Sequence, residues 1–171
     1  MQCYKCYLAS WREFSADPLA LGEERLLLRD DLMKTMKIYE LIPIGVIHSP
    51  YRKQGDAPHQ GRLSLTTSEI KISPNYAEGL KDIAKLDHLI VLYWLDQADR
   101  SMLMATPPHS EKAHGVFATR SPNRPNPIGF AVIDLLSIDG TRLIVRGLDA
   151  LDGTPVLDIK PYSAEIDCVK E

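Results

Sequence analysis

Three prolines within six residues, Pro122, Pro125 and Pro127, are the strongest constraint on the fold of this chain. They fall in the stretch GVFATRSPNRPNPIGF, which runs from Gly115 to Phe130. Proline fixes one backbone dihedral angle and has no amide hydrogen to donate, so neither a helix nor a central strand can continue through it. The sequence therefore predicts a loop over residues 121–128.

Apolar runs flank this loop on both sides. Residues 116–118 before it and residues 128–136 after it are predicted to be buried strands. A stiff loop held between two strands suits a ligand site, because its shape is fixed before anything binds. Arg120 and Arg124 supply forked donors that match a carboxylate or a phosphate. The simpler alternative, a stiff turn with solvated arginines, stays open at this point.

The remaining pattern is that of many short strands. Residues 89–95 form a nearly continuous apolar run, typical of a fully buried strand. Asp139-Gly140 is a hairpin signal between the segments 128–138 and 142–148, and Ser73-Pro74 is predicted to open a short helix. The glycine-rich loops that bind dinucleotides or nucleotide phosphates are absent from the sequence. We therefore expect a mainly β fold, a small closed or partly closed β-barrel with one or two short flanking helices, and not a Rossmann fold.

Composition sets broader bounds on function. A chain of 171 residues with 44% hydrophobic residues is expected to form one globular domain. Its net charge of −3 argues against broad electrostatic capture of nucleic acid. Since no apolar run approaches membrane-spanning length, we expect a cytoplasmic protein. Cys3 and Cys6 form a CxxC pair without a second half-site, so we expect no metal centre.

The N-terminal residues differ in character from the rest of the chain. We interpret residues 1–36 as a partly helical extension, with one amphipathic helix over 22–36, and residues 37–171 as the barrel domain. The extension would cover part of the barrel or of a partner subunit. Alternatively, Met36 is the natural start of the protein.

Four stretches of the sequence resemble one protein family. ATRSPNRPNPIG at 118–129 is similar to the central signature of the TsaA-like (TrmO-type) family, and IGVIHSPY at 44–51 and LDGTPVLDIKPY at 151–162 also agree. LDHLIVLYWL at 86–95 resembles the segment in which the family places a Ser-His or Asp-His pair. The best-known members use S-adenosyl-L-methionine to methylate threonylcarbamoyl-adenosine beside the tRNA anticodon.

This resemblance implies a cofactor site on a small β-barrel. The residues it assigns to S-adenosyl-L-methionine are Ser49, Pro50, Tyr51, Asp87, His88, Arg120, Phe130, Asp152, Gly153, Thr154 and Pro155. We expect Arg120 to face the carboxylate of the cofactor and the glycine turn at 152–155 to approach its adenine. The resemblance also implies a site near a subunit interface, and hence a homodimer.

The methyl acceptor in the family reaction is a poorly nucleophilic nitrogen, and its proton must leave. His88, Asp158 and Tyr162 are candidates for a general base, although the enzyme would also work by proximity alone. For the tRNA anticodon loop, stacking and base-edge contacts over a charged surface are expected. We assign this role to Arg124, Asn126 and Lys160.

Two other functions remain open on the sequence. One is a methyltransferase of the same fold with a different substrate, because the loops at 52–61 and 96–114 are the parts least similar to the family. The other is a non-catalytic sensor that binds S-adenosyl-L-methionine, since no base is obvious.

Overall fold

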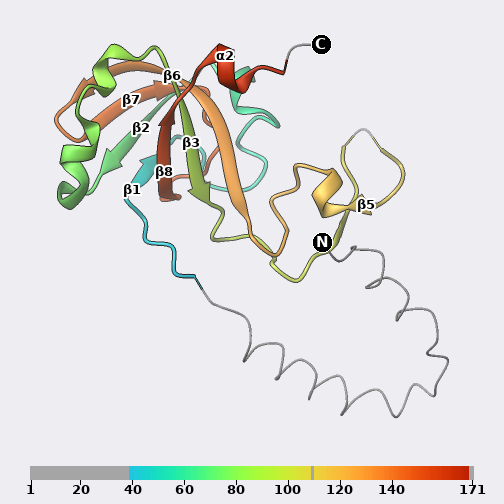
Figure 1. The fold of residues 1–171 in the computed structure, drawn as a ribbon. Coiled ribbons are helices and arrows are strands. Elements are labelled where there is room, and N and C mark those ends of the chain that lie inside the picture. The colour runs from blue at the N-terminus through green and yellow to red at the C-terminus, as the bar shows by residue number, and fades with distance from the viewer. Residues whose placement is uncertain (1–38, 109, 170–171) are drawn as a thin grey trace, which may run out of the picture. The chain divides into compact units, whose positions relative to one another are not determined.

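The computed structural model describes residues 39–108 and 110–169. The predicted extension at 1–36, with its helix over 22–36, therefore lies outside the described residues. Within the described part, six antiparallel strands close into a barrel in the order β1-β2-β7-β6-β3-β8 (Figure 1). The expected mainly β barrel is confirmed.

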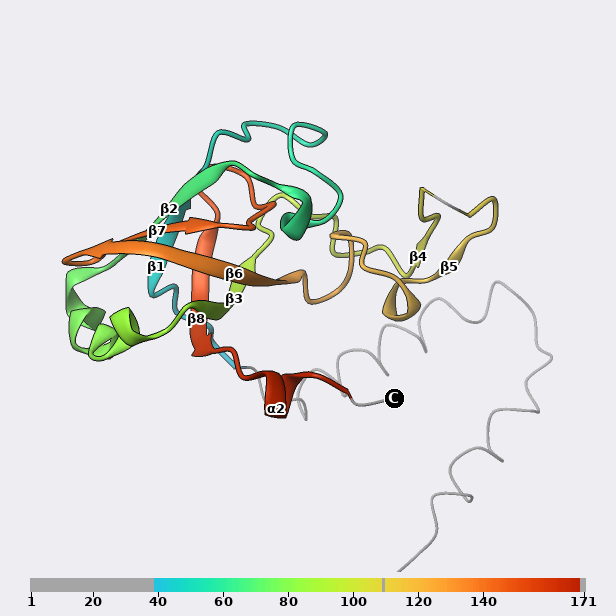
Figure 2. The same cartoon turned by 90° about the horizontal axis from the view of Figure 1, so that it is seen from above.

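The strands of the barrel are short, except for β6. They are β1 (Gly45–His48), β2 (Thr67–Ile72), β3 (His88–Trp94), β6 (Ile128–Asp139), β7 (Arg142–Arg146) and β8 (Pro155–Pro161). A separate hairpin of β4 (Met104–Ala105) and β5 (His114–Gly115) projects from the barrel in both views (Figures 1 and 2). The described helices are four 3₁₀ segments, Gly61–Leu63, Pro74–Leu80, Ile83–Lys85 and Val116–Ala118, and the short α2, Ala164–Asp167.

Strand β8 closes the barrel. It pairs with β1, where Val46 lies opposite Pro155, and with β3, where Leu89 lies opposite Pro161. The first residue of β8 therefore lies beside β1, and its last residue lies beside the start of β3. At the usual rise of a strand, these two ends of β8 are about 20 Å apart.

Each strand of the barrel contributes at least one fully buried side chain to the core. Side chains alternate between the two faces of a strand, so the inward set and the outward set are fixed by register. The fully buried representatives are Ile47 (β1), Ile70 (β2), Leu143 (β7), Ile133 (β6), Val91 (β3) and Val156 (β8). The outward positions are thus free to carry polar and functional groups.

Several local predictions are confirmed. β3 lies within one residue of the buried strand predicted at 89–95, and β6 and β7 form the hairpin predicted at Asp139-Gly140. Gly140 has a φ of 56°, a conformation that glycine adopts without strain. The segment that begins at Pro74 is a 3₁₀ helix. No helix among the described residues has the length and apolar character needed to span a membrane.

One predicted strand is wrong. Val116–Ala118 forms a single 3₁₀ turn, in which Val116 is buried and Phe117 is 82% exposed. The turn closes because the amide and the hydroxyl of Thr119 both donate to the carbonyl of Val116, at 3.1 and 3.0 Å. The apolar character of residues 116–118 predicted burial, but it did not reveal that these three residues after Gly115 form a turn.

Gly129 in the central stretch is required by packing. The position is buried on β6 opposite Tyr93 of β3, and a Cβ atom at 129 would overlap the Tyr93 ring. That ring cannot easily move, because its hydroxyl donates to Asp149 Oδ1 at 2.6 Å. Burial raises the pKa of Tyr93, so this hydroxyl keeps its proton at neutral pH.

We therefore expect Gly129→Ala to lower the free energy of unfolding by about 1–3 kcal/mol, the usual cost of overpacking a core. Urea denaturation followed by circular dichroism measures this change. Gly79→Ala is the matched control, since no atom beyond its own helical segment lies within 4 Å of the added Cβ there. Equal midpoints for the two variants would contradict the packing argument.

Candidate functional site

Two stretches that are about a hundred residues apart in sequence meet at one end of the barrel. The amide of Ser49 donates to Asp152 Oδ1 at 3.1 Å, and its hydroxyl donates to the carbonyl of Ala150 at 2.7 Å. In return, the amide of Asp152 donates to the carbonyl of Tyr51 at 2.7 Å. Seven residues predicted from the sequence thus lie together, namely Ser49, Pro50, Tyr51, Asp152, Gly153, Thr154 and Pro155.

Some of these seven residues are buried and hold the backbone of the site in place. Ser49, Tyr51 and Thr154 are buried, and the Tyr51 hydroxyl lies 2.6 Å from Ser64 Oγ. Gly153 adopts a φ of 85°, which favours glycine, and its amide donates to the carbonyl of Ile47 at 2.9 Å. These residues hold the two stretches together, which leaves Asp152 and Pro50 among those that line the surface.

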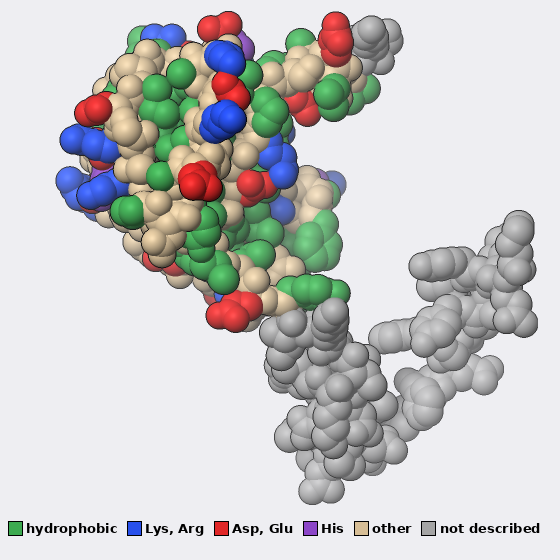
Figure 3. Space-filling model, turned by 60° about the vertical axis from the view of Figure 1, so that its left-hand side comes forward, with side chains coloured by type: hydrophobic (Ala, Val, Ile, Leu, Met, Phe, Trp, Pro, Cys, Tyr) green, Lys and Arg blue, Asp and Glu red, His purple; other side chains and the backbone are tan. Residues whose placement is uncertain are grey.

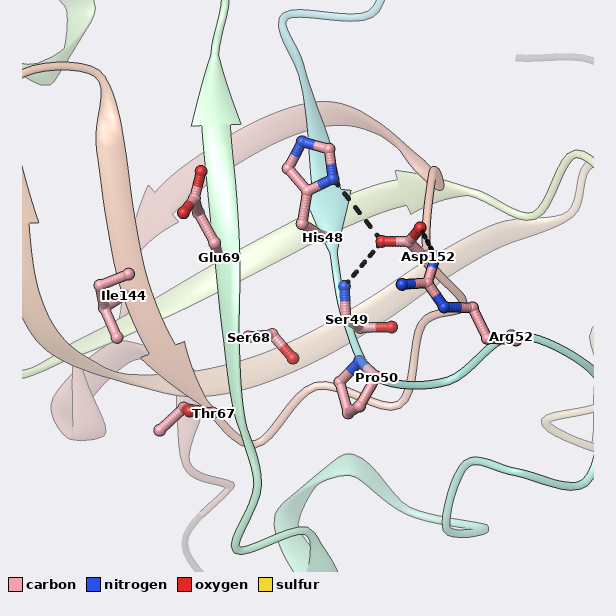
Figure 4. A pocket seen from close by; sticks show the side chains of 9 residues that line it. All are labelled: His48, Ser49, Pro50, Arg52, Thr67, Ser68, Glu69, Ile144 and Asp152. Carbon is pink, nitrogen blue, oxygen red and sulfur yellow. Dashed lines mark hydrogen bonds and ion pairs between the residues drawn. The ribbon is translucent and has the colours of Figure 1, made fainter.

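A hollow of about 450 Å³ opens beside these stretches, large enough for a small organic ligand (Figure 4). The carboxylate of Asp152 has polar contacts with three other residues that line this hollow. Oδ1 of Asp152 lies 3.6 Å from His48 Nδ1, and Oδ2 forms an ion pair with Arg52. The full lining is His48, Ser49, Pro50, Arg52, Thr67, Ser68, Glu69, Ile144 and Asp152.

Sequence reasoning missed the contribution of β2 and β7 to this hollow. Thr67 and Glu69 alternate on the outer face of β2, and Ile144 lies opposite Glu69 on β7. Arg142 donates to Glu69 Oε2 at 2.6 Å and holds the pKa of Glu69 below its usual value. The alternation of Thr67, Glu69 and Lys71 was visible in the sequence, but the pairing of β2 with β1 was not.

Asp87 and His88 do not join this group. They lie at the start of β3, next to the last residues of β8, whereas the 152–155 turn precedes the first residues of β8. The structure therefore places Asp87 and His88 at the opposite end of β8 from the seven residues around Asp152.

The second group is centred on His88. Nδ1 of His88 lies 3.1 Å from Asp134 Oδ1, while Arg146 donates to Asp134 Oδ2 through Nε at 3.1 Å and through a terminal nitrogen at 2.9 Å. The ring of Tyr162 meets the His88 ring edge-on, with centroids 6.1 Å apart. We call His88, Asp134, Arg146 and Tyr162 the His88 cluster.

Tyr162 and Asp158, the other two candidates for the general base, already have side-chain partners. The Tyr162 hydroxyl lies 3.3 Å from Cys168 Sγ, and this contact raises the pKa of Tyr162, so its proton stays on at neutral pH. Asp158 Oδ2 lies 2.6 Å from Lys160 Nζ on the outer face of β8. Lys160 therefore already faces a carboxylate.

The central loop carries the remaining predicted residues. Arg120 and Asn126 are exposed, and Phe130 points outward from β6 with 53% of its surface accessible. Arg124 is different, because its guanidinium donates to the carbonyls of Ser121 at 2.8 Å, Val116 at 3.0 Å and Thr119 at 2.6 Å. Arg124 thus holds the loop in shape, and its contact with RNA stays a prediction.

In the described part of the chain, no three His, Cys, Asp or Glu side chains gather in the manner of metal ligands. Cys3 and Cys6 lie outside the described residues.

Residues 46–168 match the family model described as the tRNA-methyltransferase O N-terminal domain. A probable S-adenosyl-L-methionine-binding protein of Archaeoglobus fulgidus is 62% identical over 134 residues, which are 78% of this chain and 37% of that protein. A second protein of this organism, named an S-adenosyl-L-methionine-binding protein, is 56% identical over 77% of this chain and 94% of its own length.

Solved structures agree with these matches. The crystal structure of TrmO from Pseudomonas aeruginosa is 34% identical, with a TM-score of 0.65, and the match covers 78% of this chain and 60% of that one. The chain thus spans only part of the length of some of these similar proteins.

The three carbonyl contacts of Arg124 lead to a test of the loop. We expect Arg124→Ala to lower the free energy of unfolding by about 2 kcal/mol, the scale of a hydrogen bond to a charged group, and to speed amide exchange over residues 116–127. Hydrogen–deuterium exchange with mass spectrometry measures this. Arg120→Ala, at an exposed position of the same loop, should leave exchange unchanged. Equal exchange in both variants would show that Arg124 does not stiffen the loop.

Proposed function

This chain belongs to the tRNA-methyltransferase O N-terminal domain family, and on that premise we propose that it is a tRNA methyltransferase that uses S-adenosyl-L-methionine. Its substrate is the modified nitrogen of threonylcarbamoyl-adenosine beside the anticodon. The observation that carries this proposal is the meeting of the Ser49–Tyr51 stretch with the 152–155 turn beside a hollow of about 450 Å³.

The groups around this hollow fit the two ends of the proposed cofactor. Asp152 suits an ammonium or a ribose hydroxyl, and Arg52 suits a carboxylate. Ile144 and Pro50 add apolar surface for a base. When bound, S-adenosyl-L-methionine supplies a methyl group activated by its sulfonium. The polar groups are already oriented by one another, since Asp152 contacts Ser49, His48 and Arg52.

The separation of the predicted residues supports a homodimer with a composite site. One chain keeps the Asp152 group and the His88 cluster at opposite ends of β8, and a symmetric pair would bring one group of each copy together. Exposed apolar side chains supply a surface for such pairing. In the described part, those on the β4–β5 lobe and the start of β6 are Met102, Leu103, Met104, Phe117, Ile128 and Phe130.

Recognition of RNA would depend on a small group of exposed side chains and not on the net charge of the protein. Charged side chains of both signs are interspersed over the face drawn in Figure 3, as expected for a net charge of −3. Exposed groups such as Arg120, Asn126 and Lys160 would contact an anticodon loop together with aromatic surface such as Phe117. Action on tRNA would place the protein in the cytoplasm.

The first test uses methyl-labelled S-adenosyl-L-methionine with total tRNA that carries its natural modifications. We expect the label on threonylcarbamoyl-adenosine after nuclease digestion and chromatography of the nucleosides. Unmodified tRNA transcripts are the control and should stay unlabelled. Label on another nucleoside would reassign the substrate, and tight cofactor binding without any label would favour a binding protein without transferase activity.

The composite site leads to a complementation test. Asp152→Asn and His88→Ala should each abolish transfer, because each damages one half of every site. Dimers re-formed from an equal mixture should recover about a quarter of the wild-type rate, since half are mixed and each mixed dimer keeps one intact site. A mixture that stays inactive, although light scattering shows mixed dimers, would place both groups in a site within one chain.

A further inference from the structure

Asp134 contacts both His88 and Arg146. Neither Asp134 nor Arg146 lies in the four stretches that resemble the family. On the outer face of the barrel, Asp134 of β6 lies opposite His88 of β3 and also opposite Arg146 of β7. Its two oxygens serve different partners, because Oδ1 lies 3.1 Å from His88 Nδ1 and Oδ2 accepts both hydrogen bonds from Arg146. The strand register of three neighbouring strands therefore fixes this arrangement.

Arg146 keeps Asp134 ionised. The hydrogen bond from Arg146 is the main reason why the pKa of Asp134 lies below its usual value. An ionised carboxylate can only accept hydrogen bonds, so the His88 nitrogen that faces it must carry a proton. A neutral imidazole has one N–H group, and the lone pair is then left on Nε2.

Nε2 of His88 is available for chemistry. The His88 side chain is 45% exposed, and none of the hydrogen bonds formed by residues 39–108 and 110–169 involves Nε2. Asp87 precedes His88 in the chain, and Lys160 and Tyr162 belong to the end of β8 that pairs with the start of β3 and to the residue after it. Tyr162 presents its ring to His88, Lys160 pairs with Asp158, and Asp134 is the carboxylate that lies within ion-pair distance of the imidazole among the described residues.

We propose that Asp134 is a positioning residue for methyl transfer, which holds His88 with Nε2 bare so that this nitrogen takes the proton of the methylated atom. The inference rests on the proposed function. The lone pair of the acceptor nitrogen forms the new bond to the methyl carbon, and the carbon–sulfur bond breaks with its electron pair left on sulfur. The N–H proton of the acceptor passes to Nε2 of His88. Asp134 stabilises the imidazolium that results, and Arg146 holds Asp134 in place.

The wild-type protein provides the first test. In nitrogen-15 NMR of histidine-labelled protein, with the His88 resonances assigned from the spectrum of His88→Gln, we expect neutral His88 to be protonated on Nδ1. A proton on Nε2 would overturn the proposal without any need for a folded Asp134 variant.

Asp134→Asn is the second test. Arg146 requires an acceptor, so the asparagine oxygen should face Arg146 and its amide nitrogen should donate to His88 Nδ1, which moves the imidazole proton to Nε2. We expect this change of tautomer in the NMR spectrum and about a 100-fold fall in kcat, the scale of general base catalysis. The KM for S-adenosyl-L-methionine should change little, and Asp134→Glu should recover part of kcat.

Asp139→Asn is the matched control, because it makes the same chemical change on β6 away from His88. It should keep the wild-type tautomer and kcat. Equal losses of kcat in the two asparagine variants, or an unchanged tautomer in Asp134→Asn, would overturn the proposal. If the tautomer changes as expected but the wild-type protein transfers no methyl group to tRNA, the proposed function fails while the effect of Asp134 on His88 stands.

Discussion

Closure of the barrel by β8 is the constraint on which the candidate sites depend. β8 is antiparallel to both of its neighbours, so its first residues lie beside β1 and its last residues lie beside the start of β3. The 152–155 turn leads into one end of this strand and Tyr162 comes directly after the other. The pairing of β8 with β1 thus places Asp152 against Ser49, and its pairing with β3 brings the Tyr162 ring to His88. The distance between the two groups is a consequence of strand length.

The signature residues divide into those that shape the protein and those that face solvent. Gly129 makes room for the Tyr93 ring, and Arg124 donates to three backbone carbonyls of its own loop. Tyr51 and Thr154 are buried supports. A family signature therefore does not list ligand contacts alone, since much of it fixes the backbone on which the contacts stand.

The sequence predicted the elements better than their partners. Apolar runs and the Asp139-Gly140 turn are local signals, and they located β3, β6 and β7. Pairing of β1 with β2 and of β6 with β3 depends on contacts between residues far apart in the sequence. The first pairing brings Thr67 and Glu69 to the hollow, and the second brings Asp134 to His88. Neither result could be predicted from the local sequence pattern. The error at residues 116–118 has the same origin. A short apolar run predicts burial, but a hydrogen bond from Thr119 decides that it forms a turn. The TsaA-like resemblance identified from four motifs is confirmed, because it depends on residue identity and order and not on pairing.

Under the proposed function, charge pairing would limit how this surface recognises RNA. Three of the arginines already face protein acceptors of opposite charge, namely Arg52 with Asp152, Arg142 with Glu69 and Arg146 with Asp134. A guanidinium paired in this way keeps donors for specific hydrogen bonds, but its charge is largely offset and attracts phosphate weakly at long range. Binding of tRNA by this domain would then depend on shape, stacking and a few direct contacts. Because fewer counterions would be released, its affinity would fall less steeply with salt than that of a basic RNA-binding module.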